Sequence, residues 1–281
     1  MNLQEIGDKI SESLEFASGE ILAQKPRSHL GASEIGNDCS AALWYKFRWV
    51  KFPQFVPRML RLFSRGHEEE PRIIKWLTGA GFNVSDIDPV TGKQYRLQDV
   101  SGHFGGSCDG IAEVPDWLFQ RIGDRRILVE FKTASAKAFA KLVKQKVKRA
   151  KPEHWAQTCT YGFKMQLNYV LYLTVNKDND EIYVEFLKID HSHGESMIRK
   201  AQDVIVAKLR PNRISEDPAH FMCKFCDMKG PCHHNEPAIK NCRSCTHCEV
   251  AEDAQWLCNK FKRIIPNDYV IKGCDQWESL I

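Results

Sequence analysis

Three residues in the middle of the chain could support phosphodiester chemistry. Glu130 and Lys132 lie two apart in residues 128–133, which read as a β-strand, so their side chains share one face. Asp109 lies in a glycine-flanked strand-like segment just before it. Carboxylates hold Mg²⁺ or Mn²⁺, which polarises a phosphate and activates water, while an ammonium stabilises developing charge. Glu-x-Lys alone is usually a surface ion pair, so other residues must decide.

Residues on both sides of this group favour the chemical interpretation. His67 lies in a helical stretch before the strands, and imidazole is a suitable Mn²⁺ ligand, although a lone histidine is more often a surface or capping residue. Gln157 and Tyr161 are four apart and share one face of a later predicted helix, whose ordinary interpretation is a half-buried amphipathic surface. Glu70, one turn after His67, could support the site.

The order His, Asp, Glu-x-Lys, Gln-x-x-x-Tyr resembles the RecB-like branch of the PD-(D/E)XK nuclease superfamily, over residues 31–232. The resemblance implies a restriction-endonuclease-like α/β core, a central mixed sheet flanked by helices. One departure is Cys108, where the family has proline before the aspartate. The implied ligands of Mg²⁺ or Mn²⁺ are His67, Asp109, Glu130 and the Phe131 carbonyl.

The same resemblance implies roles for the remaining motif residues. Lys132 would assist the nucleophile, and Gln157 and Tyr161 would position DNA. The following predicted helix carries a stripe of lysines that could follow a phosphate backbone, although a solvated helix face is the equally weighted alternative. These DNA-binding candidates are Lys137, Lys141, Lys144 and Lys148.

Eight of the eleven cysteines follow residue 220, where metal ligation is the better expectation for a reducing compartment. Cys223, Cys226 and Cys232 leave a metal or cluster site one ligand short. Iron–sulfur members of the RecB-like family, including CRISPR-associated and AddB-type nucleases, have a fourth cysteine far upstream. Cys39 occupies that place, although Ser40-Ala41 replaces the usual Pro-Arg after it. The resemblance implies a 4Fe-4S clasp, and a Cys₃His zinc site with His233 or His234 is the competing hypothesis.

The last cysteines predict a zinc-ribbon-like module. Its expected zinc ligands are Cys242, Cys245, Cys258 and Cys274, with His247 and Cys248 as substitutes. Free thiols in a flexible tail are the alternative. We therefore expect a nuclease domain with the iron–sulfur clasp over residues 1–235 and a cysteine-rich metal-binding module over 236–281.

Hydrophobic periodicity supplies the elements that must position these residues. Helices are expected around 6–14, over 40–47, over 58–77 with a break or kink near Pro71, over 135–149, 153–165 and 195–209. Strands are expected at 82–87, 95–100, 106–114, 127–133, 167–175 and 181–189. The first four strands are expected to form a meander, giving a mixed α/β core.

Composition excludes several classes of protein. The 281 residues are 43% hydrophobic and 27% charged, as in globular proteins, and the net charge is only +4. The longest apolar runs are a few residues, against about 20 needed to span a bilayer. No secretion signal opens the chain, so a cytoplasmic location without a membrane partner is expected.

We therefore expect a Mg²⁺- or Mn²⁺-dependent DNA exonuclease that hydrolyses phosphodiesters by a two-metal-type mechanism. Its expected setting is recombination, repair or phage DNA metabolism, with DNA as partner and a recombination or single-strand-binding protein as a further candidate. CRISPR spacer acquisition, a non-cutting DNA-binding adaptor and a metal-dependent RNase are the alternatives.

Overall fold

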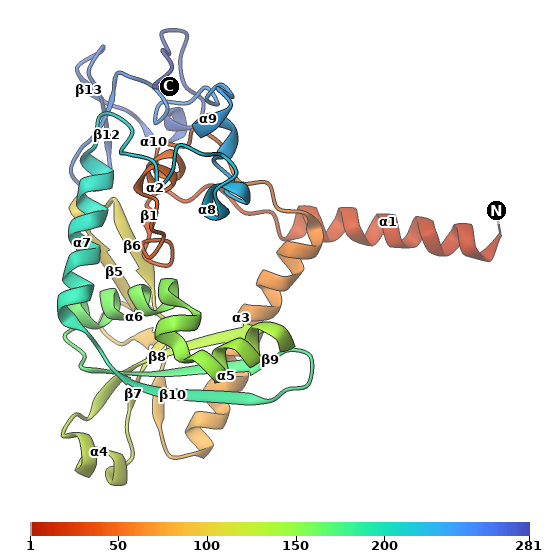
Figure 1. Ribbon diagram of the computed structural model, residues 1–281, viewed down its shortest axis with the longest axis vertical. Helices are drawn as coiled ribbons and strands as arrows, with labels where there is room; N and C mark the ends of the chain where they lie inside the picture. The colour runs from red at the N-terminus through yellow and green to blue at the C-terminus, as the bar shows by residue number, and fades with distance from the viewer. Residues whose placement is uncertain (1) are drawn as a thin grey trace.

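The computed structural model describes residues 2–281, which form a mixed α/β fold (Figure 1). Its main sheet has five strands and is mixed, because β8 pairs in parallel with β9 while every other pair is antiparallel. The strand order is β10 (Ile182–Lys188), β9 (Tyr169–Asn176), β8 (Arg126–Ala134), β7 (Gly110–Glu113) and β2 (Asn83–Ser85).

Helices cover both faces of this sheet. Ile73 and Leu77 of α3 (Pro57–Gly79) pack on Val129 and Phe131 of β8. On the opposite face, α5 (Ala136–Ala150) and α6 (Pro152–Met165) join a cluster that includes Leu128. Because side chains alternate along a strand, Glu130 and Lys132 project towards α5 and α6.

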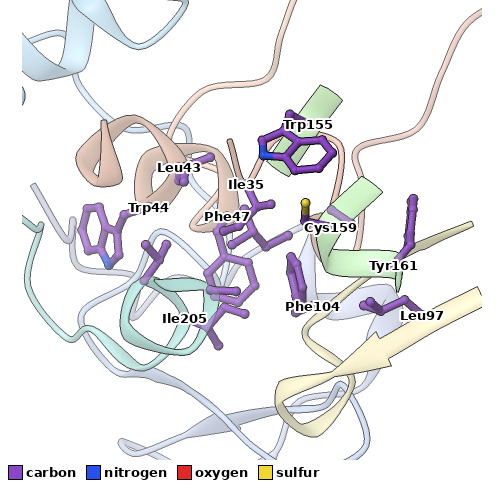
Figure 2. Packing of buried hydrophobic residues seen from close by; sticks show 14 of the residues in the cluster. Ile35, Leu43, Trp44, Phe47, Leu97, Phe104, Trp155, Cys159, Tyr161 and Ile205 are labelled. Atoms are coloured by element: carbon purple, nitrogen blue, oxygen red, sulfur yellow. The ribbon is translucent and has the colours of Figure 1, made fainter. Parts of the chain in front are cut away.

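A second sheet holds the segment that leads to the site. Its strands are β1 (Leu30–Gly31), β6 (Phe104–Ser107) and β5 (Arg96–Asp99), with β1 and β6 parallel. Helices α2 (Ser40–Phe47) and α7 (His191–Val206) pack beside it. Figure 2 shows the shared core, in which Trp44 and Phe47 of α2 lie near Ile205 of α7 and Phe104 of β6.

The C-terminal part folds back onto α2 (Figure 1). The Trp256 ring packs at a tilt against the Phe47 ring, with 5.3 Å between ring centroids. The C-terminal part contains three short helices, α8 (Phe221–Lys224), α9 (Lys229–His233) and α10 (Asn267–Val270). It also contains an antiparallel sheet of β11 (Cys248–Val250), β12 (Trp256–Cys258) and β13 (Arg263–Ile264).

The remaining elements lie at the periphery. Helix α1 (Leu3–Ile21) has no buried residue and projects away from the body (Figure 1). The others are β3 (Ile87–Asp88), β4 (Lys93–Gln94), the 3₁₀ turn η1 (Val100–Gly102) and α4 (Asp116–Ile122). No helix within residues 2–281 combines the length and apolar character needed to cross a membrane.

Three expected elements differ from the structure. The strand expected over 82–87 is divided into β2 of the main sheet and β3, which pairs with β4. Helix α3 continues through Pro71 instead of breaking there, and burial of Ile73 and Leu77 against the sheet favours this continuation. The strand expected over 106–114 is divided, because β6 belongs to one sheet and β7 to the other. The first strands are therefore not a simple meander, and the crossing between sheets places Asp109 at the junction.

Candidate active site

Glu130 is the buried centre of the candidate site. Its side chain is inaccessible to solvent, and Oε1 accepts a short hydrogen bond from Lys132 Nζ. Oε2 is equally buried and has no hydrogen-bond partner among the described residues. An unpartnered buried carboxylate oxygen is costly, so this atom is available to a cation or a hydrogen-bond donor from a ligand.

Asp109 joins this group through the backbone. Its Oδ2 accepts a 2.6 Å hydrogen bond from the Phe131 N–H, which fixes the carboxylate between Glu130 and Lys132 on β8. Phe131 therefore contributes its amide as observed, while metal binding by its carbonyl stays a prediction. The Phe131 ring faces the other way, into the α3 side of the sheet.

Helix α3, which packs against β8, adds a carboxylate to this group. Glu70 is half-buried, and its Oε1 lies 3.2 Å from His67 Nδ1. The His67 side chain is 76% exposed, so it reaches the site by way of Glu70. Burial and the nearby Asp109 raise the pKa of Glu70. Glu70, only a supporting residue in the sequence argument, is thus placed closer to the acidic group than His67.

The charges of the group are strongly coupled. Burial raises the pKa of Glu130 to about 7, with Asp109 and Glu70 acting in the same direction and Lys132 opposing them. Burial alone would lower the pKa of Lys132, but Glu130 and Asp109 raise it above its usual value. Lys132 is therefore an ammonium at neutral pH, facing more carboxylates than it can neutralise.

Gln157 and Tyr161 support the site from α6. Both side chains are buried, and the Tyr161 hydroxyl donates a 2.8 Å hydrogen bond to the Ser107 carbonyl, two residues before Asp109. A Cβ at Gly106 would lie 2.6 Å from this hydroxyl, so glycine is needed for the approach. Burial raises the pKa of Tyr161, which keeps its proton. The structure shows Tyr161 holding the loop that leads to Asp109, while Gln157 acts on the Tyr161 side chain. Direct contact of either residue with DNA stays a prediction.

Two residues of the site have no counterpart in the sequence analysis. Tyr172 lies opposite Glu130 in the β8–β9 register, and its hydroxyl is 2.6 Å from His154 Nδ1 on α6. Burial, together with the charges of Lys132 and Lys151, lowers the pKa of His154 to about 3. His154 precedes Gln157 by one helical turn, so the Gln-x-x-x-Tyr pattern extended backwards would have found it.

The four predicted DNA-binding lysines are all exposed on α5. Lys144 and Lys148 line an open concavity of about 610 Å³, together with Lys146 and Arg149, whereas Lys137 and Lys141 do not. Lys146 has φ of 66°, which interrupts the regular helix. The four lysines therefore do not form the single straight stripe that their spacing predicts.

The cysteines gather in two places. One cavity is lined by Cys39 from the N-terminal segment and by Cys223, Cys226, Cys232 and His233 from the C-terminal part. Burial and neighbouring thiols raise the pKa values of Cys223 and Cys226. A second cavity is lined by Cys242, Cys245, Cys248, Cys258 and Cys274. All these cysteines are free.

The candidate ligand side chains lie near one another but are not arranged around a common metal position. Across residues 2–281, no group of three or more His, Cys, Asp or Glu side chains is arranged to hold a metal ion. The structure thus shows which candidate ligands lie together, and the metals themselves stay proposals.

Comparisons with known proteins give low similarity. No protein-family model and no curated protein matches the chain. Among solved structures, LHK-Exo in complex with dAMP is 14% identical, with a TM-score of 0.43 over 63% of this chain and 86% of that one. LHK-Exo, an alkaline exonuclease from Laribacter hongkongensis, is 14% identical in a second structure, with a TM-score of 0.42 over 64% and 87%. SSO0001 is 16% identical, with a TM-score of 0.41 over 78% and 94%. The function is therefore inferred from the site itself.

Proposed function

We propose that the chain is a divalent-metal-dependent deoxyribonuclease with a PD-(D/E)XK-type site that acts on DNA ends. The observation that carries this proposal is the fully buried Glu130, which has one oxygen on Lys132 and the other without a partner. Glu69 of α3 also has one oxygen on an arginine and the other without a partner among the described residues. Glu130 differs because Asp109 and Glu70 lie close enough to act on its charge, so several carboxylates surround its free oxygen. The proposed setting is recombination, repair or phage DNA metabolism.

The residues present fit a hard cation. Asp109, Glu130 and Glu70 supply oxygen donors, which Mg²⁺ and Mn²⁺ prefer, and their mutual repulsion is what such an ion relieves. His67 would reach the ion only by turning inward past Glu70. Bound there, one or two ions would supply polarisation of the phosphate and activation of water.

The protein side chains would do the rest of the work. The Lys132 ammonium would stabilise negative charge on the phosphate and orient the attacking water in a buried environment, where electrostatic interactions are strong. Tyr161 holds the Ser107 carbonyl and so fixes the start of the Asp109 loop. Lys144 and Lys148 would guide the DNA backbone through the concavity beside α5.

We propose in addition that Cys39, Cys223, Cys226 and Cys232 hold a 4Fe-4S cluster. Four thiols from segments about 190 residues apart line one cavity, which fits the four thiolates that such clusters use. The cluster would tie the N-terminal segment to the part of the chain that follows the core. Anaerobically purified protein should be brown and contain iron; a colourless protein with zinc alone in this site would contradict the assignment.

Degradation of end-labelled linear DNA and of circular DNA tests the proposed activity. The wild type should degrade linear DNA with Mg²⁺ or Mn²⁺ and not with chelator, and the released label gives the direction. Lys132→Ala and Glu130→Gln should lose activity by a factor of about 100 or more while still binding DNA. Lys9→Ala, on the projecting α1, is the matched control and should keep full activity.

Other outcomes identify the alternatives. If the wild type binds DNA but cuts neither substrate with any divalent metal, the adaptor hypothesis replaces the nuclease. If the wild type cuts labelled RNA and does not cut DNA, the proposed substrate is wrong, but the proposed metal-dependent hydrolysis of phosphodiesters is kept.

A further inference from the structure

Two arginine side chains are buried where the C-terminal residues 236–281 meet the N-terminal residues 27–50. Arg243 is 1% exposed and Arg48 is 3% exposed. Arg243 stacks on Trp49 and Trp256, with its Cζ 4.1 and 4.6 Å from the ring centroids. Neither arginine has a salt-bridge partner in the described part of the chain. Burying an unpaired guanidinium is strongly unfavourable, so a counter-charge is expected close by.

The hydrogen bonds of these arginines are made to neutral groups. Arg48 donates to the carbonyls of Cys245 and Cys248, at 3.1 and 2.9 Å. Arg243 donates to the Ser28 carbonyl at 3.1 Å and to the carbonyl of Phe47. The Nε atoms of both arginines are buried without a partner. These carbonyls accept from the terminal guanidinium nitrogens, but as neutral groups they do not balance the two positive charges.

The obvious carboxylate does not balance them either. Glu249 lies close enough to act on Arg48, but it is paired with Lys208 at 2.7 Å. What adjoins the arginines instead is the second cysteine cavity, whose lining includes Cys245 and Cys248. Strand pairing places Cys248 opposite Cys258, so two neighbouring strands each contribute a thiol to this cavity.

We propose that Cys242, Cys245, Cys258 and Cys274 bind one Zn²⁺ ion as thiolates, and that Arg48 and Arg243 are the buried counter-charges of this centre. Each thiol releases its proton to solvent on binding. Four thiolates around one divalent ion carry two net negative charges, which the two guanidiniums match. These residues lie outside the proposed nuclease site, so this proposal can fail or succeed independently of it.

The proposed centre acts as a clasp between the two ends of the chain. Besides the arginine contacts, the Asn241 side chain donates to the Trp49 carbonyl at 2.9 Å, and the Ile239 N–H donates to the Val50 carbonyl at 2.9 Å. Loss of the metal would protonate the thiols and leave both arginines uncompensated. Residues 27–50 should then open together with the tail.

Metal analysis of the full-length protein tests the ligand set. The wild type should contain one zinc per chain, measured separately from iron, and Co²⁺ exchanged into the site should give the absorption of a tetrahedral thiolate centre. Cys242→Ser and Cys258→Ser should each lose this zinc. Cys159→Ser, at a buried cysteine of α6, should keep it.

Charge-retaining variants test the arginines. Arg48→Met should weaken zinc retention against a competing chelator by about 10–100-fold, as expected for a residue that supports a metal site, while Arg48→Lys should stay close to the wild type. In wild-type protein, chelation should raise hydrogen exchange in residues 27–50. The proposal is overturned by zinc-free wild type, by zinc that survives Cys242→Ser, or by equal retention in Arg48→Met and wild type.

Discussion

Tyr161 shows how a single buried hydroxyl can control a loop that bears a carboxylate. This hydroxyl donates a hydrogen bond to the Ser107 carbonyl, at 2.8 Å, and the ring is enclosed by the core. Removing the hydroxyl leaves a buried carbonyl without this donor. The position of Asp109 then depends on fewer contacts.

We expect Tyr161→Phe to reduce the free energy of unfolding by about 1–2 kcal/mol. We also expect it to lower kcat more than KM, since the Asp109 loop would be less well fixed. Denaturant unfolding and DNA degradation measure the two effects. Gly106→Ala should behave similarly, because its Cβ would displace the same hydroxyl. Unchanged kcat in both variants would remove Tyr161 from the positioning role.

His154 predicts a loss of stability in acid. Its pKa is about 3 in the folded chain, chiefly because of burial, against about 6.5 when unfolded. Between these values the unfolded state binds a proton that the folded state does not. The free energy of unfolding therefore falls as pH decreases from about 6.5 towards 3, by up to about 1.4 kcal/mol per pH unit.

His154→Asn should flatten this dependence, because asparagine keeps a polar side chain near the Tyr172 hydroxyl but does not titrate. Denaturant midpoints measured from pH 7 to 4 would show it. His29, with a pKa of about 4, should still contribute to the dependence of the free energy of unfolding on pH in the His154→Asn variant. A substitution of His29 is therefore the comparison for His154→Asn. Parallel curves for the wild type and His154→Asn would contradict the burial argument.

The sequence predicted which residues form the site, but it did not predict how deeply Glu130 is buried. Asp109, Glu130 and Lys132 were found from residue type and a two-residue spacing, and the structure brings them together. That Glu130 is entirely buried, opposite Tyr172, follows from the parallel pairing of β8 with β9. No local pattern specifies a cross-strand register between residues 42 positions apart.

At the scale of elements, the close contact of α6 and α7 depends on glycine. A Cβ at Gly194 of α7 would overlap the Cys159 carbonyl of α6, whereas a Cβ at Gly162 would meet only the Ile189 side chain. Backbone cannot move away as a side chain can. The two glycines therefore differ in how much they tolerate.

Gly194→Ala should lower the free energy of unfolding by about 1–3 kcal/mol, the usual cost of overpacking. Gly162→Ala should cost less, and Gly7→Ala, which has open space on α1, should cost nothing. Urea unfolding of the three variants provides the comparison. A Gly194→Ala protein as stable as the wild type would show that the helices can separate freely.

The interruption of α5 at Lys146 predicts unequal roles for its lysines. Periodicity extends a regular helix through this residue, because left-handed backbone at a lysine has no signal in the sequence. Beyond it, Lys148 turns onto the Trp155 ring, 4.2 Å from the centroid. The concavity that results contains Lys144 and excludes Lys137.

Lys144→Ala should therefore weaken DNA binding and reduce the slope of log affinity against log salt by about 0.7–0.9, the value of one phosphate contact. Lys137→Ala should change the slope less. Binding titrations at several salt concentrations measure both. Equal slopes for the two variants would favour the straight lysine stripe over the concavity.

At the scale of the whole molecule, α1 is nearly independent of the body. None of its residues is buried, and its hydrogen bonds to α3 come from Arg61, which contacts Glu15 and Ser18. Exposed ion pairs of this kind contribute about 0–1 kcal/mol. The helix itself was predictable from its four-residue apolar spacing, but the restriction of its contacts to the first part of α3 was not.

Removal of residues 1–21 should therefore lower the free energy of unfolding by less than about 1 kcal/mol. Thermal and denaturant unfolding of the shortened chain measure it, and DNA degradation should be unchanged. A large loss of stability would mean that α1 packs on the body in solution.

The contacts between residues 27–50 and residues 236–281 have a consequence for synthesis of the chain. Arg48 bonds to the carbonyls of Cys245 and Cys248, about 200 positions away, and Arg243 bonds to Ser28. A ribosome makes the first partner of each pair many seconds before the second, at about 5–20 residues per second. These contacts of residues 27–50 cannot form until residues 243–248 have been made. Nascent chains stalled before residue 240 should therefore be more open to protease around Arg48 than the finished chain, although α2 already has its contacts with α7.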